Sequence, residues 1–138
     1  MTELNYPIAE VRGITQAQVN ALSEAGYATT IALLSACATR RERDEVARRT
    51  GLDGAEVLAI ANRADLMRVK GIGTKWGDLL ELAGVDTVVE LAARNPANLR
   101  AKLAEVNAEK TVVKALPTEA DCADWVAQAT ALPRRLAY

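Results

Sequence analysis

The side chains best suited to chemistry in this 138-residue chain surround a short glycine-rich turn. Gly71 and Gly73 flank Ile72, with Lys70 just before them and Lys75 just after. Glycines permit a tight turn and a close approach of the backbone to a ligand. A helix that starts after the turn offers an anion free N–H groups and the positive end of its dipole. We therefore expect backbone amides and basic side chains to hold a phosphate here. The candidate site consists of Arg68, Lys70, Gly71, Ile72, Gly73, Thr74 and Lys75.

The same residues also have a purely structural interpretation. The turn can be a helix–helix corner in which Ile72 only closes the core, and the basic residues can be ordinary solvated surface. Trp76, directly after the turn, can stack on a base or pack against the core. A second basic stretch, residues 40–49, interleaves Arg with Asp and Glu at helical spacing. That spacing favours ion pairs along a helix over contact with nucleic acid.

A diverged copy of the turn occurs 58 positions earlier, where residues 8–34 align with residues 66–92. In both copies a Gly-Ile pair is followed 13 residues later by another glycine. The first copy has Thr15 in place of the second glycine, so phosphate binding is less expected there. The weaker candidate site consists of Arg12, Gly13, Ile14 and Thr15.

The elements that position these turns are predicted to be helices. Thr15, Thr39, Asp53 and Thr87 are each followed three residues later by Gln or Glu, which is typical of a capping box. The Asn-Pro pair at 95–96 also indicates a helix start. Apolar residues recur at helical spacing, and no segment alternates as a strand does. We expect an all-α protein of about eight to ten short helices.

The stretch Leu66–Gly84 resembles the helix-hairpin-helix motif, whose nucleic-acid-binding members hold a phosphate on the hairpin amides. Residues 66–73, 81–107 and 116–133 resemble a bacterial family of unknown function, DUF4332, whose members carry such repeats. With the internal repeat, this resemblance predicts two pseudo-symmetric helix-hairpin-helix halves, residues 1–64 and 65–138. We expect the halves to pack as one compact domain, a SAM-like helical bundle. The resemblance implies little about activity, because the family has no assigned function and fold does not determine function.

Composition argues against an enzyme. The chain has no His, which removes the imidazole base and the His metal ligand. No phosphate loop of the Gly-x4-Gly-Lys-Ser/Thr type occurs. Cys37 and Cys122 lack partners at metal-binding spacing, so buried free thiols are favoured over a disulfide or a metal site. We predict no catalytic residues, no metal and no cofactor.

Two function classes remain open. The glycine-rich turn at residues 70–75, called the second hairpin below, favours weak, sequence-independent binding to a DNA or RNA backbone. The net charge of −1 favours a protein-interaction or scaffold module, because proteins that bind nucleic acid by electrostatics alone are usually basic. We expect no small-molecule substrate and no membrane association, and the absence of a signal-like N-terminus favours a cytoplasmic protein.

Overall fold

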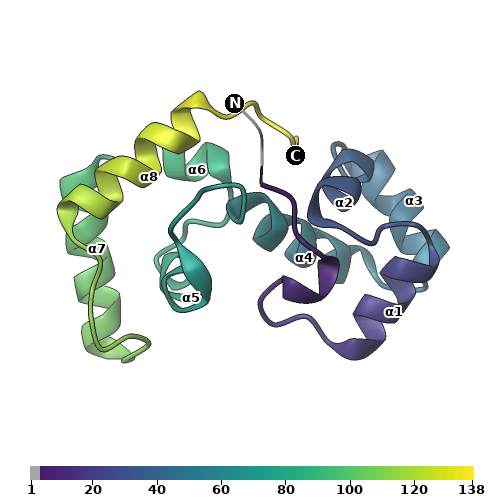
Figure 1. The fold of residues 1–138 in the computed structure, drawn as a ribbon, viewed down its shortest axis with the longest axis horizontal. Helices are drawn as coiled ribbons and strands as arrows, with labels where there is room; N and C mark the ends of the chain where they lie inside the picture. Colours follow the sequence, from purple (N-terminus) through teal and green to yellow (C-terminus); the bar gives the residue numbers. More distant parts are fainter. Residues whose placement is uncertain (1–3) are drawn as a thin grey trace. The chain divides into compact units, whose positions relative to one another are not determined.

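The computed structural model describes residues 4–138 and is all-helical, as expected from the sequence (Figure 1). In this range the backbone forms one 3-10 helix and eight α-helices, and its only β-type pairing is an isolated antiparallel bridge between Pro7 and Thr29. The helices are η1 (Ile8–Glu10), α1 (Gln16–Glu24), α2 (Thr30–Ala36), α3 (Arg40–Thr50), α4 (Gly54–Leu66), α5 (Gly73–Leu82), α6 (Val88–Ala92), α7 (Pro96–Glu109) and α8 (Glu119–Ala131). None of these helices is long and apolar enough to cross a membrane.

Most helix starts are determined by local capping. Outside α5, the residue before each α-helix accepts a hydrogen bond from a first-turn backbone N–H through its side chain, which satisfies an otherwise unpaired donor. These capping residues are Thr15, Thr29, Thr39, Asp53, Thr87, Asn95 and Thr118. The helix starts predicted at Thr15, Thr39, Asp53, Thr87 and Asn95 are therefore confirmed.

The chain divides into two compact units. Unit 1 contains the residues up to Arg68 together with Arg134–Tyr138, and unit 2 is Val69–Pro133. The boundary falls four residues after the predicted one, and the last five residues belong to unit 1 instead of the second half. The pseudo-symmetry of the halves and their packing as one domain stay predictions.

Unit 1 is built around α4, which packs against α2 and α3, while α1 packs against η1 and α3 (Figure 1). Burial of apolar side chains from these helices drives their association. The core residues are Ile8, Val11, Leu22, Leu33, Leu34, Cys37, Val46, Val57, Ile60, Ala61, Ala64 and Leu136.

The C-terminal tail is part of this core. Leu136 is 3% exposed, and the Ala137 N–H donates to the Ala38 carbonyl at 2.7 Å. The Tyr138 ring lies over the Arg43 guanidinium, 5.5 Å from its carbon to the ring centroid. The Tyr138 hydroxyl also donates to Asn62 at 2.6 Å. The tail is thus an integral part of unit 1.

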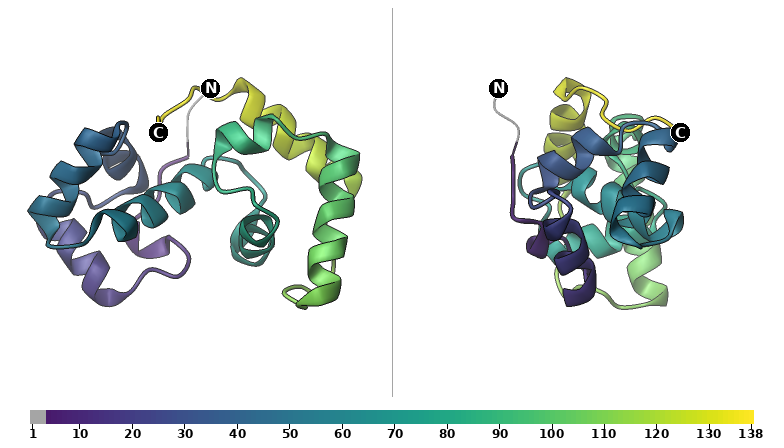
Figure 2. Two further views of the ribbon diagram at one scale, coloured as in Figure 1. Left: turned by 180° about the vertical axis from the view of Figure 1, so that it is seen from behind. Right: turned by 90° about the vertical axis from the view of Figure 1, so that its right-hand side faces the viewer.

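Unit 2 is organised around α8, which packs against α6 and α7, while α5 packs against α7 (Figures 1 and 2). Trp125, in the middle of α8, is the largest of its fully buried side chains. The turn that precedes α5 belongs to this unit, so α5 and α8 are the elements that position the second hairpin.

Candidate functional site

The second hairpin has the backbone that its glycines predict. Gly71 has a φ of 100° and Gly73 a φ of 70°, both in the left-handed region that side-chain-bearing residues rarely adopt. Between them Ile72 is in the right-handed region and only 6% exposed. Its side chain therefore anchors the turn while the glycine backbone on either side is exposed.

Helix α5 starts without a side-chain cap. Its N-cap residue is Ile72, whose apolar side chain accepts no hydrogen bond. Among residues 4–138 it is the one α-helix start of this kind, since Thr, Asp or Asn caps the others. The first-turn amides of a helix need an acceptor from a cap, from water or from a ligand. The start of α5 therefore offers donors next to an exposed glycine turn.

A glutamine from α8 holds the turn in place. The Lys70 backbone N–H donates to Gln128 Oε1 at 2.8 Å, and Gln128 Nε2 donates to the Lys70 carbonyl at 2.9 Å. Gln128 Nε2 also donates to Asp124 Oδ2 at 2.9 Å, which determines the orientation of the amide. This paired contact joins residues 58 positions apart and restrains the hairpin before any ligand arrives.

The structure divides the predicted basic residues into two groups. Lys70, Thr74 and Lys75 are exposed at the turn. Arg68 is different: its side chain is 1% exposed, and its Nη1 lies 2.7 Å from the Asp65 carboxylate in unit 1. A guanidinium buried on a carboxylate does not face a phosphate in solvent, so we remove Arg68 from the candidate site. The sequence identified the charge of Arg68 but not its burial.

The two tryptophans of the chain pack on each other in unit 2. Their ring centroids are 5.5 Å apart with planes inclined at 58°. Trp125 is 2% exposed and is a core residue of α8. Trp76 is half-buried, and its indole N–H donates to the Ala115 carbonyl at 3.0 Å. Trp76 therefore packs within unit 2, which is one of the two roles expected from the sequence.

Two residues at the hairpin were missed by the sequence analysis: Gln128 and Trp125. Gln128 clamps the turn, and Trp125 Nε1 lies 3.6 Å from where a Cβ on Gly71 would be. No local signal could have found these residues, because both approach the turn through tertiary contacts.

The first hairpin is the diverged turn at residues 12–15. It differs from the second hairpin in how the following helix, α1, is capped. Thr15 Oγ1 accepts from the Gln18 N–H at 3.1 Å, and Gln18 Oε1 accepts from the Thr15 N–H at 3.0 Å. This capping box occupies donors that a phosphate would need. Next to it, a Cβ added to Gly13 would be 3.0 Å from Arg63 Nη1, so an arginine of α4 lies against this turn. Of the weaker candidate residues, Arg12 and Ile14 are half-buried, whereas Gly13 and Thr15 are exposed.

The basic stretch of α3 forms the ion pairs that its spacing predicts. Arg48 and Arg49 both bind the Glu45 carboxylate, with Arg49 Nε at 3.0 Å. Hydrogen bonds from Arg48 and Arg49 lower the pKa of Glu45, and this same carboxylate raises the pKa of each arginine.

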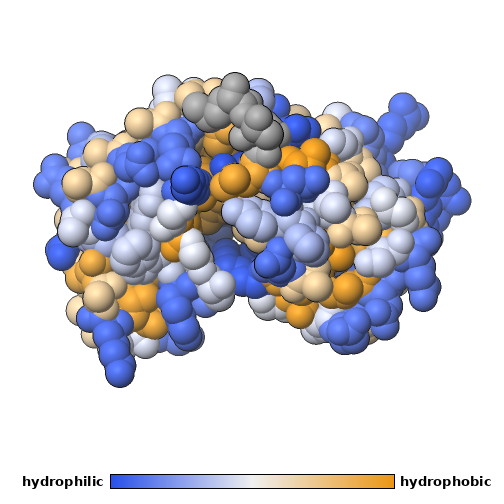
Figure 3. Space-filling model, viewed as in Figure 1, coloured by the Kyte–Doolittle hydropathy of each residue, from blue (hydrophilic) through white to orange (hydrophobic). Residues whose placement is uncertain are grey.

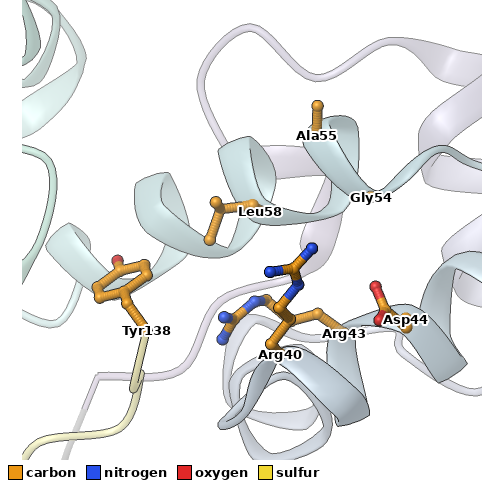
Figure 4. A pocket seen from close by; sticks show the side chains of 7 residues that line it. All are labelled: Arg40, Arg43, Asp44, Gly54, Ala55, Leu58 and Tyr138. Atoms are coloured by element: carbon orange, nitrogen blue, oxygen red, sulfur yellow. The ribbon is translucent and has the colours of Figure 1, made fainter.

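Unit 1 contains a pocket of about 430 Å³ between α3, α4 and the tail (Figure 4). It is lined by Arg40, Arg43, Asp44, Gly54, Ala55, Leu58 and Tyr138. The Arg43 side chain is engaged within the unit, because its Nη1 donates to the Cys37 carbonyl at 2.9 Å and its guanidinium lies under Tyr138. Arg43 therefore holds the tail on α3, and the pocket is the space left beside that contact.

Both cysteines are free and buried, as expected. Burial raises the pKa of the Cys37 thiol to about 12 and also raises that of Cys122, so both thiols are protonated at neutral pH. Within residues 4–138, no group of three or more His, Cys, Asp or Glu side chains is placed to hold a metal ion.

One comparison with known proteins gives a match. The model of a family described as a domain of unknown function, DUF4332, matches residues 12–132, which is most of the chain. No curated protein and no solved structure matches this chain.

Proposed function

This chain belongs to the DUF4332 family, whose function is unknown, and we propose from the site alone that it binds nucleic-acid backbones through the second hairpin. The binding is independent of base sequence and non-enzymatic. The binding residues are Lys70, Gly71, Ile72, Gly73, Thr74 and Lys75. In this proposal Ile72 acts through its backbone, because its side chain is buried.

The observation that carries the proposal is the uncapped start of α5. A phosphate oxygen there accepts from first-turn amides and lies at the positive end of the helix dipole. The other helix starts already have an acceptor from their own N-cap side chain, including α1 at the first hairpin. Capping of α1 by Thr15 makes the first hairpin, with Arg12, Gly13 and Ile14, the secondary site.

Charge and rigidity support the same site. Lys70 and Lys75 are exposed on both sides of the turn. The Gln128 clamp holds the backbone in one conformation, which lowers the ordering cost of binding. Asp124, bonded to Gln128, places a negative charge on the same face and opposes the lysines.

These contacts account for weak, non-specific affinity. Amides and lysines that contact phosphates position a protein without reading bases. With few such contacts, we expect a dissociation constant of roughly 10⁻⁴–10⁻⁶ M at physiological salt. A cytoplasmic location is part of the proposal and is supported by the two free thiols.

The test is fluorescence anisotropy with labelled DNA and RNA, single- and double-stranded, at about 50 and 200 mM salt. Three proteins are compared: the wild type, Lys70→Glu/Lys75→Glu, and the charge-matched control Arg40→Glu/Arg41→Glu. The control changes exposed arginines at the start of α3, where the helix dipole favours acidic residues, so we expect this variant to fold. Circular dichroism checks the fold of each variant.

The expected result is salt-sensitive binding by the wild type and by the control, with binding at least tenfold weaker in the hairpin variant. Equal losses in both variants would mean that total charge, not the hairpin, controls binding. If the wild type does not bind at low salt, the hairpin is only a structural turn between helices and not a binding site.

A protein-interaction module is the second candidate. Its support is the exposure of two large apolar side chains in unit 2, Leu82 at 47% and Val89 at 40%. Each unit presents interspersed hydrophilic and hydrophobic residues on the face in Figure 3. Sedimentation velocity of the wild type and of Leu82→Asp/Val89→Asp tests whether these residues mediate self-association. A monomer at every concentration in both proteins would leave this candidate without support.

A further inference from the structure

The second hairpin lies against an indole N–H that has no acceptor within residues 4–138. Trp125 is 2% exposed, and its Nε1 lies 3.6 Å from the position that a Cβ on Gly71 would occupy. Its ring packs on Trp76, but within residues 4–138 its indole N–H forms no hydrogen bond. Among the described residues, this nitrogen is not one of the fully enclosed side-chain atoms that lack a partner, so it is accessible at the turn.

The absence of a side chain at Gly71 is what leaves this N–H next to the turn. With φ at 100° the position favours glycine, and glycine leaves no Cβ between the indole and the backbone. Trp125 is one position after Asp124 and three before Gln128, so the face of α8 that clamps Lys70 also carries the indole. A buried tryptophan normally has a partner for its N–H, which makes an unpaired one beside an anion-accepting turn informative.

We propose that Trp125 is a ligand of the phosphate, donating its indole N–H to a phosphate oxygen held at the second hairpin. This inference rests on the proposed function and extends it, because it adds a donor from α8 to the amides of α5. The indole is neutral and held rigidly by its packing on Trp76, so it donates with little loss of conformational freedom. The site thus also has an uncharged donor beside Asp124.

The first measurement follows the two indole N–H resonances of the ¹⁵N-labelled full-length chain during titration with an unlabelled DNA duplex. Trp76 is the internal control, because its N–H is already bonded to the Ala115 carbonyl. Trp76→Phe and Trp125→Phe assign the two signals. We expect the Trp125 signal to move with duplex concentration and to saturate, while the Trp76 signal moves much less. A stationary Trp125 signal at saturating duplex would overturn the inference.

The second measurement is the duplex affinity of Trp125→Phe by anisotropy, with Trp76→Phe as the matched control. Phenylalanine keeps most of the ring packing and removes the donor. Since hydrogen bonds to charged groups contribute about 1.5–3 kcal/mol, we expect roughly tenfold weaker binding or more for Trp125→Phe. The control keeps the Trp125 N–H, so we expect it to weaken binding less than Trp125→Phe does.

These results separate the inference from the function on which it depends. Wild-type binding that Lys70→Glu/Lys75→Glu abolishes and Trp125→Phe leaves unchanged would keep the hairpin function and reject the indole ligand. Absence of wild-type binding would reject both. If Trp125→Phe fails to fold, the resonance shift in the wild-type protein still decides the question.

Discussion

Arg68 and Lys70 are two positions apart but have different roles, because burial separates them. The Arg68 guanidinium lies on Asp65 with both side chains at most 2% exposed, whereas Lys70 is in solvent. An arginine presents planar donors that suit a carboxylate, and a buried charge requires such a partner. A lysine in solvent remains available for a phosphate. At the residue scale, the exposure of a basic side chain decides whether it stabilises the fold or contributes to a site.

Replacement of Arg68 by Met tests this assignment. The variant leaves the Asp65 carboxylate buried without its guanidinium, and breaking such a pair costs about 3–5 kcal/mol. We expect a loss of that order in the free energy of unfolding, measured by urea denaturation. Asp65→Leu/Arg68→Met should recover most of it, because two apolar residues leave no unpaired charge. Duplex affinity of the folded Arg68→Met variant should equal that of the wild type, and a selective loss of binding would return Arg68 to the site.

Cys37 should contribute to alkaline instability. Burial raises the pKa of its thiol to about 12 in the folded protein, against an ordinary value of 9.0. Between these values the unfolded chain loses a proton that the folded chain retains, so stability falls as pH rises through that window. One such group contributes a slope of up to about 1.4 kcal/mol per pH unit.

The measurement is the free energy of unfolding of wild type and Cys37→Ala between about pH 8.5 and 11. The variant is less stable at every pH because of the cavity, so the slope is the readout. We expect a shallower decline for Cys37→Ala, and parallel curves would contradict the assignment.

At the element scale, the hairpin depends on how α5 starts and on which face α8 presents. Ile72 occupies the position where the other helices have Thr, Asp or Asn. The start of α5 therefore lacks a side-chain cap, and the Ile72 side chain packs in the core instead. Gln128 then supplies from α8 the restraint that a capping side chain would have given. The cost of an uncapped helix, typically about 1 kcal/mol, is offset when a ligand provides the acceptor.

The two ends of α5 allow a matched glycine test. Gly73 at its start and Gly84 after its end have φ of 70° and 87°, and a Cβ at either would meet nothing within 4 Å. Replacement by Ala therefore adds backbone strain alone, about 1–2 kcal/mol at each position. We expect similar losses of stability by thermal unfolding, but weaker duplex binding only for Gly73→Ala. Equal affinities of the two variants would show that the backbone geometry of the turn does not matter for binding.

At the scale of the whole molecule, the chain forms two units. The C-terminal tail follows unit 2 in sequence but belongs to unit 1. Leu136 and its neighbours complete the core of unit 1, although they follow the last helix of unit 2 in sequence. Residues from both ends of the chain are therefore needed to form unit 1. The candidate hairpin, both tryptophans and the α8 face lie in unit 2, so the binding site and the tail belong to different units.

Leu136→Ala tests this division. Removal of a buried Leu side chain costs about 2–5 kcal/mol, here within unit 1. Tryptophan fluorescence reports on unit 2 alone, because Trp76 and Trp125 are the only tryptophans, whereas circular dichroism reports on both units. We expect Leu136→Ala to lower the first unfolding transition seen by circular dichroism while the fluorescence transition changes less. Leu103→Ala, buried in unit 2, should shift the fluorescence transition instead. Equal shifts by both probes for Leu136→Ala would show that the units unfold as one.

The sequence by itself determined the local structure of this protein. Thr15, Asp53 and Asn95 predicted where helices start, because a capping side chain acts on amides within its own first turn. Gly71 and Gly73 predicted the turn for the same reason, since left-handed backbone conformation is a property of the residue itself. The all-α fold followed from such local signals added along the chain.

Tertiary structure alone decided which of these residues are available for function. Burial placed Arg68 on Asp65 and removed it from the site. Packing of α8 brought Gln128 and Trp125 to the turn, and the tail brought Leu136 into unit 1. These contacts join positions far apart in sequence, and they depend on which apolar surfaces pack together. A local pattern contains no information about that choice, so the exposure and partners of each candidate residue became visible only in the folded chain.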